Sequence, residues 1–292
     1  MLAPRIDCVL ETRSLLGEGP IWDTHEAKLY WVDIRAPALL CLTPSDGKVS
    51  RWAMPSAIGC VALRASGGLL VGLHDGLYGF DTESEALSRL VSLEPDQPQN
   101  RLNDGKCDRY GRFWIGTMHD ASTETTGSLY RVDRDRTFSR ILKDIGTPNS
   151  VAWSPDNRWF YFADTRKDCI RAYAYDLSTG SIGKGHVFAG PGAAAGRPDG
   201  ATVDEVGCLW SARYGGGAVV RFMPNGRIDR IVELPVRQVT SCAFGGHDLS
   251  TLYVTTSRWR LTEAELASQP LAGGLFAITA GVRGVPETPF AG

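Results

Sequence analysis

The sequence lacks the features that would place it in a membrane, on nucleic acid or in a secretory route. No run approaches the ~18 consecutive apolar residues that a membrane-spanning helix needs. The 31 Lys and Arg nearly balance the 33 Asp and Glu, so a net charge of −2 gives no electrostatic basis for binding nucleic acid or an anionic membrane. Asp7 and Glu11 stand where an export signal would be apolar, so no such signal is expected.

Cysteine pairs and the common catalytic motifs are also missing. The seven cysteines are an odd number without a C-x-x-C pair, and most lie in apolar runs, so we expect free thiols and a cytoplasmic location. The sequence has no G-x-S-x-G nucleophile elbow, Walker A loop, dinucleotide fingerprint, EF-hand loop or zincin histidine pair. An active site in this chain therefore needs residues that no local motif marks.

What the sequence does contain is a repeat with a period of 40 to 50 residues. Each unit runs from a short strand through a Gly-, Asp- or Asn-rich turn into further apolar strands. The six units begin at Glu18, Ile58, Asn103, Asn149, Asp199 and Thr240. Short strands repeated at this period are typical of β-propeller blades, so we predict an all-β, six-bladed β-propeller.

The predicted propeller forms one domain over residues 1–292. Residues Ile6 to Thr12 read as a strand outside the six units, which we expect to complete the last blade and close the ring. Sustained helical periodicity is missing, and the best helical segment, Thr262 to Gln269, spans about two turns.

The first position of each unit carries polar side chains that the fold does not require. The residues there are Glu18, Asn103, Asn149 and Asp199 in four of the six units. Because the first strand of a blade lies nearest the axis, these side chains should meet at one mouth of the central channel. Carboxylate and amide oxygens suit Ca²⁺, Mg²⁺ or Mn²⁺, and Fe²⁺ or Zn²⁺ also fit.

An alternative interpretation is structural, because Asp or Asn before Gly or Ser can make a tight turn at a strand entrance. Asn149-Ser150 and Asp199-Gly200 fit that description, whereas Glu18 has no such turn preference. The remaining positions, Ile58 and Thr240, are expected to line the channel or contact substrate.

Further candidates lie near the same mouth. Arg101 precedes Asn103 by two residues, and its planar guanidinium suits substrate oxygens, although a loop arginine on the surface is the alternative. Asp104 reads equally well as a second carboxylate or as a turn residue. His119 and Asp120 follow the second strand of the third unit, where a loop could fold over the mouth.

These residues lie in motifs that resemble the senescence marker protein/gluconolactonase/regucalcin family. The motifs are Leu16-Gly-Glu-Gly-Pro-Ile-Trp22, Asn100-Arg-Leu-Asn-Asp-Gly-Lys106, Gly111-Arg-Phe-Trp-Ile-Gly-Thr-Met118, Pro198-Asp-Gly200 and Thr240-Ser-Cys-Ala-Phe-Gly-Gly246. Together they extend over nearly the whole chain. The resemblance implies a six-bladed propeller with one divalent metal ion at the channel mouth and lactonase activity on sugar lactones.

The resemblance also implies roles for particular residues. Its metal ligands match Glu18, Asn149 and Asp199, and its substrate-binding pair matches Arg101 and Asn103. Apart from the resemblance, we consider Asp199 the candidate general base because it is a carboxylate as well as a ligand. A metal-bound carboxylate is a weak base, so a hydroxide generated at the metal is the alternative.

The match departs in the loop after Met118. Regucalcin-like members carry an acidic pair and a glutamate there, whereas this chain has His119-Asp120-Ala121, closer to bacterial aldonolactonases. Asp120 is therefore expected to contact substrate, and which sugar lactone is bound stays open.

The predicted function is metal-dependent hydrolysis of an aldono-lactone to the aldonic acid in sugar catabolism. The expected partner is a small sugar lactone, with no nucleic acid and no membrane, and the protein is expected to be a monomer. One alternative is a calcium-binding regulatory protein, and another is an esterase or phosphotriesterase on the same scaffold. Three protein ligands with open positions suit catalysis better than tight calcium buffering. The oxygen ligands do not choose among Ca²⁺, Zn²⁺, Mn²⁺, Mg²⁺ and Fe²⁺.

Overall fold

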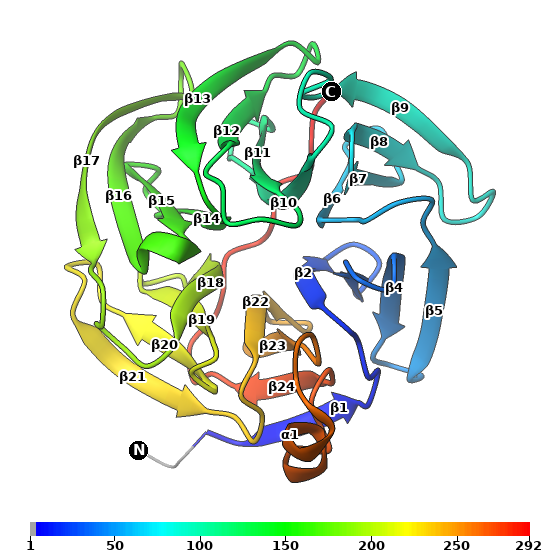
Figure 1. Ribbon diagram of the computed structural model, residues 1–292, viewed down its shortest axis with the longest axis vertical. Helices are drawn as coiled ribbons and strands as arrows, with labels where there is room; N and C mark the ends of the chain where they lie inside the picture. Colours follow the sequence, from blue (N-terminus) through cyan, green and yellow to red (C-terminus); the bar gives the residue numbers. More distant parts are fainter. Residues whose placement is uncertain (1–3) are drawn as a thin grey trace.

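The computed structural model describes residues 4–292 and arranges them as six four-stranded sheets in a ring (Figure 1). The predicted all-β, six-bladed propeller is confirmed. Within each blade neighbouring strands pair antiparallel, and the first strand lies nearest the axis (Figure 1). Blades are numbered here in the chain order of these inner strands.

Blades 1 to 5 each use four consecutive strands. Blade 1 contains β2 (Gly17–Asp23), β3 (Lys28–Asp33), β4 (Ala38–Thr43) and β5 (Lys48–Ala53). Blade 2 contains β6 (Cys60–Leu63), β7 (Leu69–Leu73), β8 (Gly76–Phe80) and β9 (Leu87–Ser92). Blade 3 contains β10 (Asn100–Cys107), β11 (Phe113–His119), β12 (Gly127–Val132) and β13 (Phe138–Ile145). Blade 4 contains β14 (Pro148–Trp153), β15 (Trp159–Asp164), β16 (Cys169–Asp176) and β17 (Ser181–Ala189), with the short 3₁₀ helix η1 (Thr165–Lys167) after β15. Blade 5 contains β18 (Arg197–Val203), β19 (Leu209–Tyr214), β20 (Ala218–Phe222) and β21 (Ile228–Glu233).

Blade 6 combines the first strand of the chain with its last three strands. It contains β22 (Val239–Gly245), β23 (Thr251–Thr256), β24 (Leu275–Thr279) and β1 (Ile6–Leu10). The N-terminal strand β1 pairs antiparallel with β24, so one sheet closes the ring. Helix α1 (Glu263–Ser268) interrupts this blade between β23 and β24, where the sequence predicts a two-turn helix, and Thr262 and Glu265 form its capping box.

The blades pack through large apolar side chains and buried carboxylates. Trp114 of blade 3 is fully buried, and its ring lies 4.9 Å from that of Phe160 in blade 4. Its indole Nε1 donates to Asp108 at 3.1 Å, and in blade 5 the indole of Trp210 donates to Asp204 at 2.9 Å. These aspartates belong to the repeat's turns, so this polar part of the repeat builds the fold and not the site.

All seven cysteines are free thiols, as predicted. Within residues 4–292, no helix is long and apolar enough to cross a membrane.

Five of the six inner strands share an irregularity near the candidate positions, whereas β6 of blade 2 pairs without one. The pairing register with the second strand shifts between Glu18 and Ile21, Leu102 and Gly105, Asn149 and Ala152, Pro198 and Ala201, and Val239 and Ser241. A bulge places an extra residue in one strand and re-aims its side chains. Ser150, directly after Asn149, has φ 57°, in the left-handed region. The interpretation as tight turns at strand entrances is therefore wrong, because the polar residues lie inside the strands.

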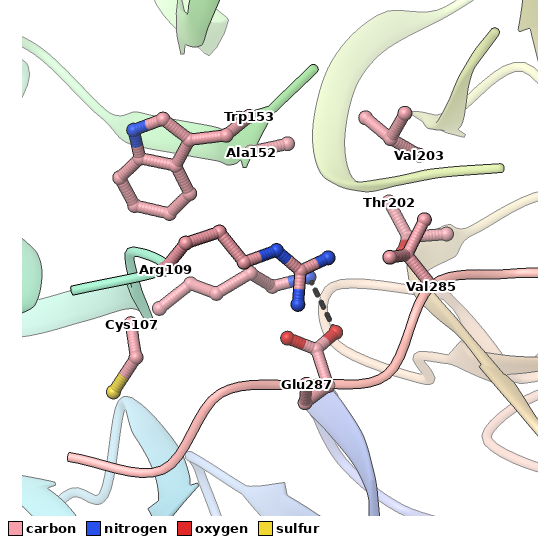
Figure 2. Close-up of a pocket in the computed structure, with 9 residues that line it drawn as sticks. Cys107, Arg109, Ala152, Trp153, Thr202, Val203, Val285 and Glu287 are labelled. Atoms are coloured by element: carbon pink, nitrogen blue, oxygen red, sulfur yellow. Dashed lines mark hydrogen bonds and ion pairs between the residues drawn. The ribbon is translucent and has the colours of Figure 1, made fainter. Parts of the chain in front are cut away.

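The C-terminal segment after β24 covers the far mouth of the channel, where the inner strands end (Figures 1 and 2). Glu287 of this segment forms an ion pair with Lys106 of β10 at 3.1 Å, drawn as a dashed line in Figure 2. Further along, Phe290 is fully buried, and its backbone exchanges two hydrogen bonds with blade 2, with Leu63 and Ala65 at 2.8 Å each. The path of this segment is not predicted by the repeat.

Thr240 ties blade 6 to blade 1. The Thr240 hydroxyl donates to the carbonyl of Gly17 at 2.6 Å and lies 2.9 Å from the hydroxyl of Thr255. The Thr240 side chain has no exposure to solvent. Thr240→Val keeps the shape but leaves this carbonyl without its donor, so we expect the free energy of unfolding to fall by about 1–3 kcal/mol. Urea unfolding measures this, with the exposed Thr279→Val as control. Equal stability of the two variants would contradict a closing role for Thr240.

Candidate active site

One cavity opens at the mouth where the inner strands begin. It has a volume of about 590 Å³, within the usual range for small-molecule sites. The predicted site residues that line it are Glu18, Arg101, Asn103, Asp120, Asn149 and Asp199. They come from blades 1, 3, 4 and 5, so the ring brings together all six side chains that the sequence predicts for the site.

A chain of hydrogen bonds fixes the two amides. Asn103 Nδ2 donates to the Pro148 carbonyl at 2.9 Å and to Asn149 Oδ1 at 3.2 Å. Asn149 Nδ2 donates to Thr165 Oγ1 at 2.8 Å. Because both amide hydrogens need acceptors, this network directs Asn149 Oδ1 away from Thr165, and that oxygen has a second lone pair for a cation.

The carboxylates are buried and close enough to repel one another. Glu18 is 9% exposed and Asp199 6% exposed. Burial raises the pKa of Glu18 to about 8, with help from the charge of Asp104, and burial and the charge of Glu18 raise the pKa of Asp199 well above its usual value. Glu18 Oε2 accepts a hydrogen bond from the Gly19 amide at 3.1 Å. The nearby charge of Arg101 offsets only part of the cost of ionising Glu18.

Asp104 is a strand residue and not a turn residue. It lies within β10 at the bulge, and its Oδ2 accepts the backbone N–H of Val151 in blade 4 at 3.1 Å. Burial also raises its pKa. Its charge raises the pKa of Glu18 and of Asp199, so it belongs to the electrostatics of the site.

This donor set fits a hard divalent cation. A bound cation would stabilise the ionised forms of Glu18 and Asp199, which burial penalises, and Asn149 Oδ1 is the third oxygen donor at the same mouth. In the described part of the chain, His, Cys, Asp and Glu side chains do not form a group of three that could hold a metal. The amide of Asn149 would therefore have to complete a three-ligand set.

Arg101 is held in place by a second arginine acting through Asp120. Arg101 Nε donates to Asp120 Oδ1 at 2.5 Å, and its Nη1 donates to Asn103 Oδ1 at 2.7 Å. Arg35 donates two hydrogen bonds, of 2.9 and 2.7 Å, to the same carboxylate. The Arg35 guanidinium also lies 4.9 Å from the centre of the Trp259 ring. Burial opposes ionisation of Asp120, but the hydrogen bonds from Arg35 and the charge of Arg101 outweigh it and lower its pKa.

Two expected contacts are absent from this site. Ile58 lies in the hydrophobic core with no exposure, and Thr240 is used in the blade 6 to blade 1 contact, so within the described residues neither lines the cavity. The expectation that they line the channel or contact substrate is wrong, because neither side chain is exposed. His119 organises the loop, because its Nδ1 accepts the backbone N–H groups of Ala121 and Ser122 at 3.2 and 3.0 Å.

Comparison with known proteins identifies the family. A family model described as the SMP-30/Gluconolactonase/LRE-like region matches residues 16–258. The chain belongs to this family. The 6-deoxy-6-sulfogluconolactonase of Pseudomonas putida is 40% identical over 291 residues, covering 98% of this chain and 99% of that protein. Regucalcin of Oryctolagus cuniculus is 35% identical over 299 residues and matches along the full length of both chains.

A solved structure supports the same assignment. The crystal structure of a calcium-binding protein, regucalcin, from Agrobacterium tumefaciens has a TM-score of 0.93 to this chain at 34% identity. The match covers 97% of this chain and 96% of that one. The family resemblance predicted from the motifs is thus confirmed.

This member of the SMP-30/gluconolactonase family has further mouth residues that sequence reasoning missed. They are Arg35, Arg166, Arg197, Tyr214, Trp259 and Arg260. Apart from Arg197, all lie at the end of a blade's second strand or in the loop after it, where the chain returns to the mouth at which the first strand began. That position in the repeat is the signal that could have found them.

Proposed function

We propose that this protein hydrolyses an aldono-lactone to the aldonic acid in sugar catabolism, with a divalent metal ion held by Glu18, Asn149 and Asp199. The observation that carries the proposal is the convergence of these oxygen donors with Arg101 and Asn103 in one cavity. The lactonase named among its relatives supports the same reaction. The free thiols of the described chain are consistent with our proposal of a cytoplasmic location.

The side chains of the cavity can divide the reaction among them. A divalent ion bound there would supply Lewis-acid polarisation of the lactone carbonyl. Asp199 accepts a proton from the attacking water while the oxygen of this water forms a bond to the carbonyl carbon. The bond from that carbon to the ring oxygen then breaks, and the proton passes from Asp199 to the ring oxygen. Because burial disfavours the ionised form of Asp199, the bound cation would be needed to keep its carboxylate ionised and able to accept the proton.

Arg101 is placed to orient the substrate. Its side chain is 4% exposed, and within residues 4–292 its Nη2 has no hydrogen-bond partner. Since Nε and Nη1 are held by Asp120 and Asn103, the guanidinium presents Nη2 to a substrate oxygen without further ordering. We propose that Asp120 shares in substrate binding, because its side chain is 30% exposed and lines the cavity.

A panel assay tests this function. The metal-stripped protein is assayed by pH-stat against gluconolactone, xylonolactone, arabinolactone and galactonolactone, with Ca²⁺, Mg²⁺, Mn²⁺, Zn²⁺ or Fe²⁺ restored in turn and spontaneous opening subtracted. We expect turnover of at least one lactone that depends on the added metal. Aryl esters and organophosphates run alongside; turnover of these alone would favour an esterase. Tight calcium binding without turnover of any lactone would favour a calcium-binding role like that of the Agrobacterium tumefaciens regucalcin.

Asp120 should affect substrate affinity more than metal affinity. Asp120→Asn removes the charge that Arg35 and Arg101 share, so Arg101 loses a charge-assisted hydrogen bond. We expect kcat/KM for the lactone to fall about 10–100-fold, the range found for supporting residues, mostly through KM. The metal affinity of Asp120→Asn, measured by calorimetry, should stay unchanged. Asp75→Asn, which breaks an exposed ion pair with Arg89, is the matched control. Unchanged kinetics in Asp120→Asn would contradict this role.

A further inference from the structure

The cavity mouth carries an excess of positive charge. The lining cations are Arg35, Arg101, Arg166, Arg197 and Arg260, and the lining carboxylates are Glu18, Asp120 and Asp199. Two of these carboxylates belong to the proposed metal site, so a bound divalent ion would increase the excess. A neutral sugar ring requires few cations for its recognition, which makes the remaining arginines informative.

Three of the five arginines already have structural partners. Arg35 and Arg101 share the carboxylate of Asp120. Arg166 in η1 donates from Nε to Thr147 Oγ1 at 3.1 Å and from Nη2 to the Ser122 carbonyl at 2.6 Å. It thereby holds the loop that follows β11 over the mouth.

The guanidinium groups of Arg197 and Arg260 are not engaged in this way. In the described chain neither side chain forms a hydrogen bond or an ion pair, and both residues are exposed at the rim. Their positions follow from the blade repeat. Arg197 precedes Asp199 by two residues, as Arg101 precedes Asn103, and both arginines sit opposite the end of a second strand, Tyr214 and Met118 respectively.

Tyr214 connects these two arginines to the metal side of the cavity. Arg197 is its cross-strand partner, and the charges of Asp199 and Arg260 both act on its phenol. Arg197, Tyr214 and Arg260 all line the cavity that contains Asp199, the proposed general base. Because one cavity of about 590 Å³ contains both these arginines and the proposed metal ligands, a single small substrate could contact both.

We propose that Arg197 and Arg260 form an anion-binding subsite, and that the preferred substrate is a sugar lactone with an anionic substituent away from its carbonyl. The inference rests on the proposed lactonase function. Carboxylate, phosphate and sulfonate groups share the chemistry that the subsite requires, since each presents oxygens that a guanidinium binds with two parallel hydrogen bonds. The surplus positive charge would also attract such substrates to the mouth.

A matched set of lactones tests the subsite. Glucono-lactone is compared with analogues that carry a carboxylate, a phosphate or a sulfonate at carbon 6, and kcat/KM is measured for each at low and at high salt. We expect at least one anionic lactone to exceed the neutral one by about tenfold or more, with the preference reduced by salt. Comparing kcat/KM among the three anionic lactones shows which anionic group the subsite prefers.

Substitutions assign the preference to these residues. The double variant R197Q/R260Q should lose most of the preference, through a higher KM for the anionic lactone, whereas R197K/R260K should keep part of it. Arg227→Gln, at an exposed turn of blade 5, is the control and should keep all of it. Thermal unfolding confirms that each variant is folded.

The outcomes separate the two proposals. If the protein hydrolyses neutral and anionic lactones equally well, the anion subsite is wrong and the lactonase function stands. If no lactone is hydrolysed with any metal, the proposed function itself fails. If the preference persists in the folded double variant, then other residues recognise the anion and the assignment to Arg197 and Arg260 is overturned.

Discussion

Asp199→Asn is expected to lower kcat for lactone hydrolysis by about 10²–10⁴-fold, the contribution of a positioned general base. Asparagine keeps the shape of the side chain and one oxygen, but it cannot accept the proton of the attacking water. The side chain is 6% exposed, so bulk water has poor access to act in its place. The measurement is kcat at saturating lactone, corrected for spontaneous opening.

Two further measurements make this result interpretable. Calorimetry of metal binding separates loss of a base from loss of a ligand, because a variant that still binds metal but does not turn over has lost the base. Asp229→Asn, on the outer strand of blade 5, should keep wild-type kcat because its carboxylate is far from the cavity residues in the fold. Full activity in Asp199→Asn would remove Asp199 from the mechanism.

The second large effect concerns stability without metal. In the metal-free protein burial raises the pKa of Glu18 from 4.5 to about 8, so the folded state binds this proton more tightly than the unfolded chain does. The resulting stability is complete below about pH 4.5 and is lost as the pH rises through about 8. We expect the free energy of unfolding to fall by roughly 2–5 kcal/mol over this range, measured by urea unfolding in a chelator.

Adding a divalent ion should reverse this loss. An ion at 100 times its Kd stabilises the folded state by about 2.7 kcal/mol, and it binds the ionised carboxylates that form at high pH. Glu18→Gln should flatten much of the metal-free pH dependence and remove most of the metal-induced stabilisation, whereas the exposed Glu83→Gln should change neither. A metal-free protein whose stability rises between pH 5 and 8 would contradict the buried-carboxyl account.

The repeat made a large part of the site predictable. Once the six units are aligned, the position shared by Glu18, Asn149 and Asp199 is visible, because a propeller places equivalent residues of every blade around one axis. The same reasoning was wrong for Ile58 and Thr240. Equivalence fixes where a backbone position lies, but the neighbouring blade decides whether its side chain packs or faces the cavity.

Other features required contacts between distant segments. The hydrogen bonds from Arg35 to Asp120 connect blade 1 to the loop of blade 3, and the two residues are 85 positions apart in the sequence. The ion pair between Glu287 and Lys106 likewise depends on a C-terminal segment without a repeat of its own. The C-terminal segment carries no periodic signal, and the position of Arg35 in the repeat indicates the mouth but not its partner Asp120.

The amino-acid sequence by itself determined the six-bladed fold, the family and the residues that gather at one mouth of the channel. It could do so because strand periodicity and the unit length are local properties that repeat along the chain. The tertiary structure decided how those residues are oriented, which carboxylates are buried together, and which arginines remain free. These properties depend on bulges, on burial and on partners from other blades, all of which exist only when the ring is closed.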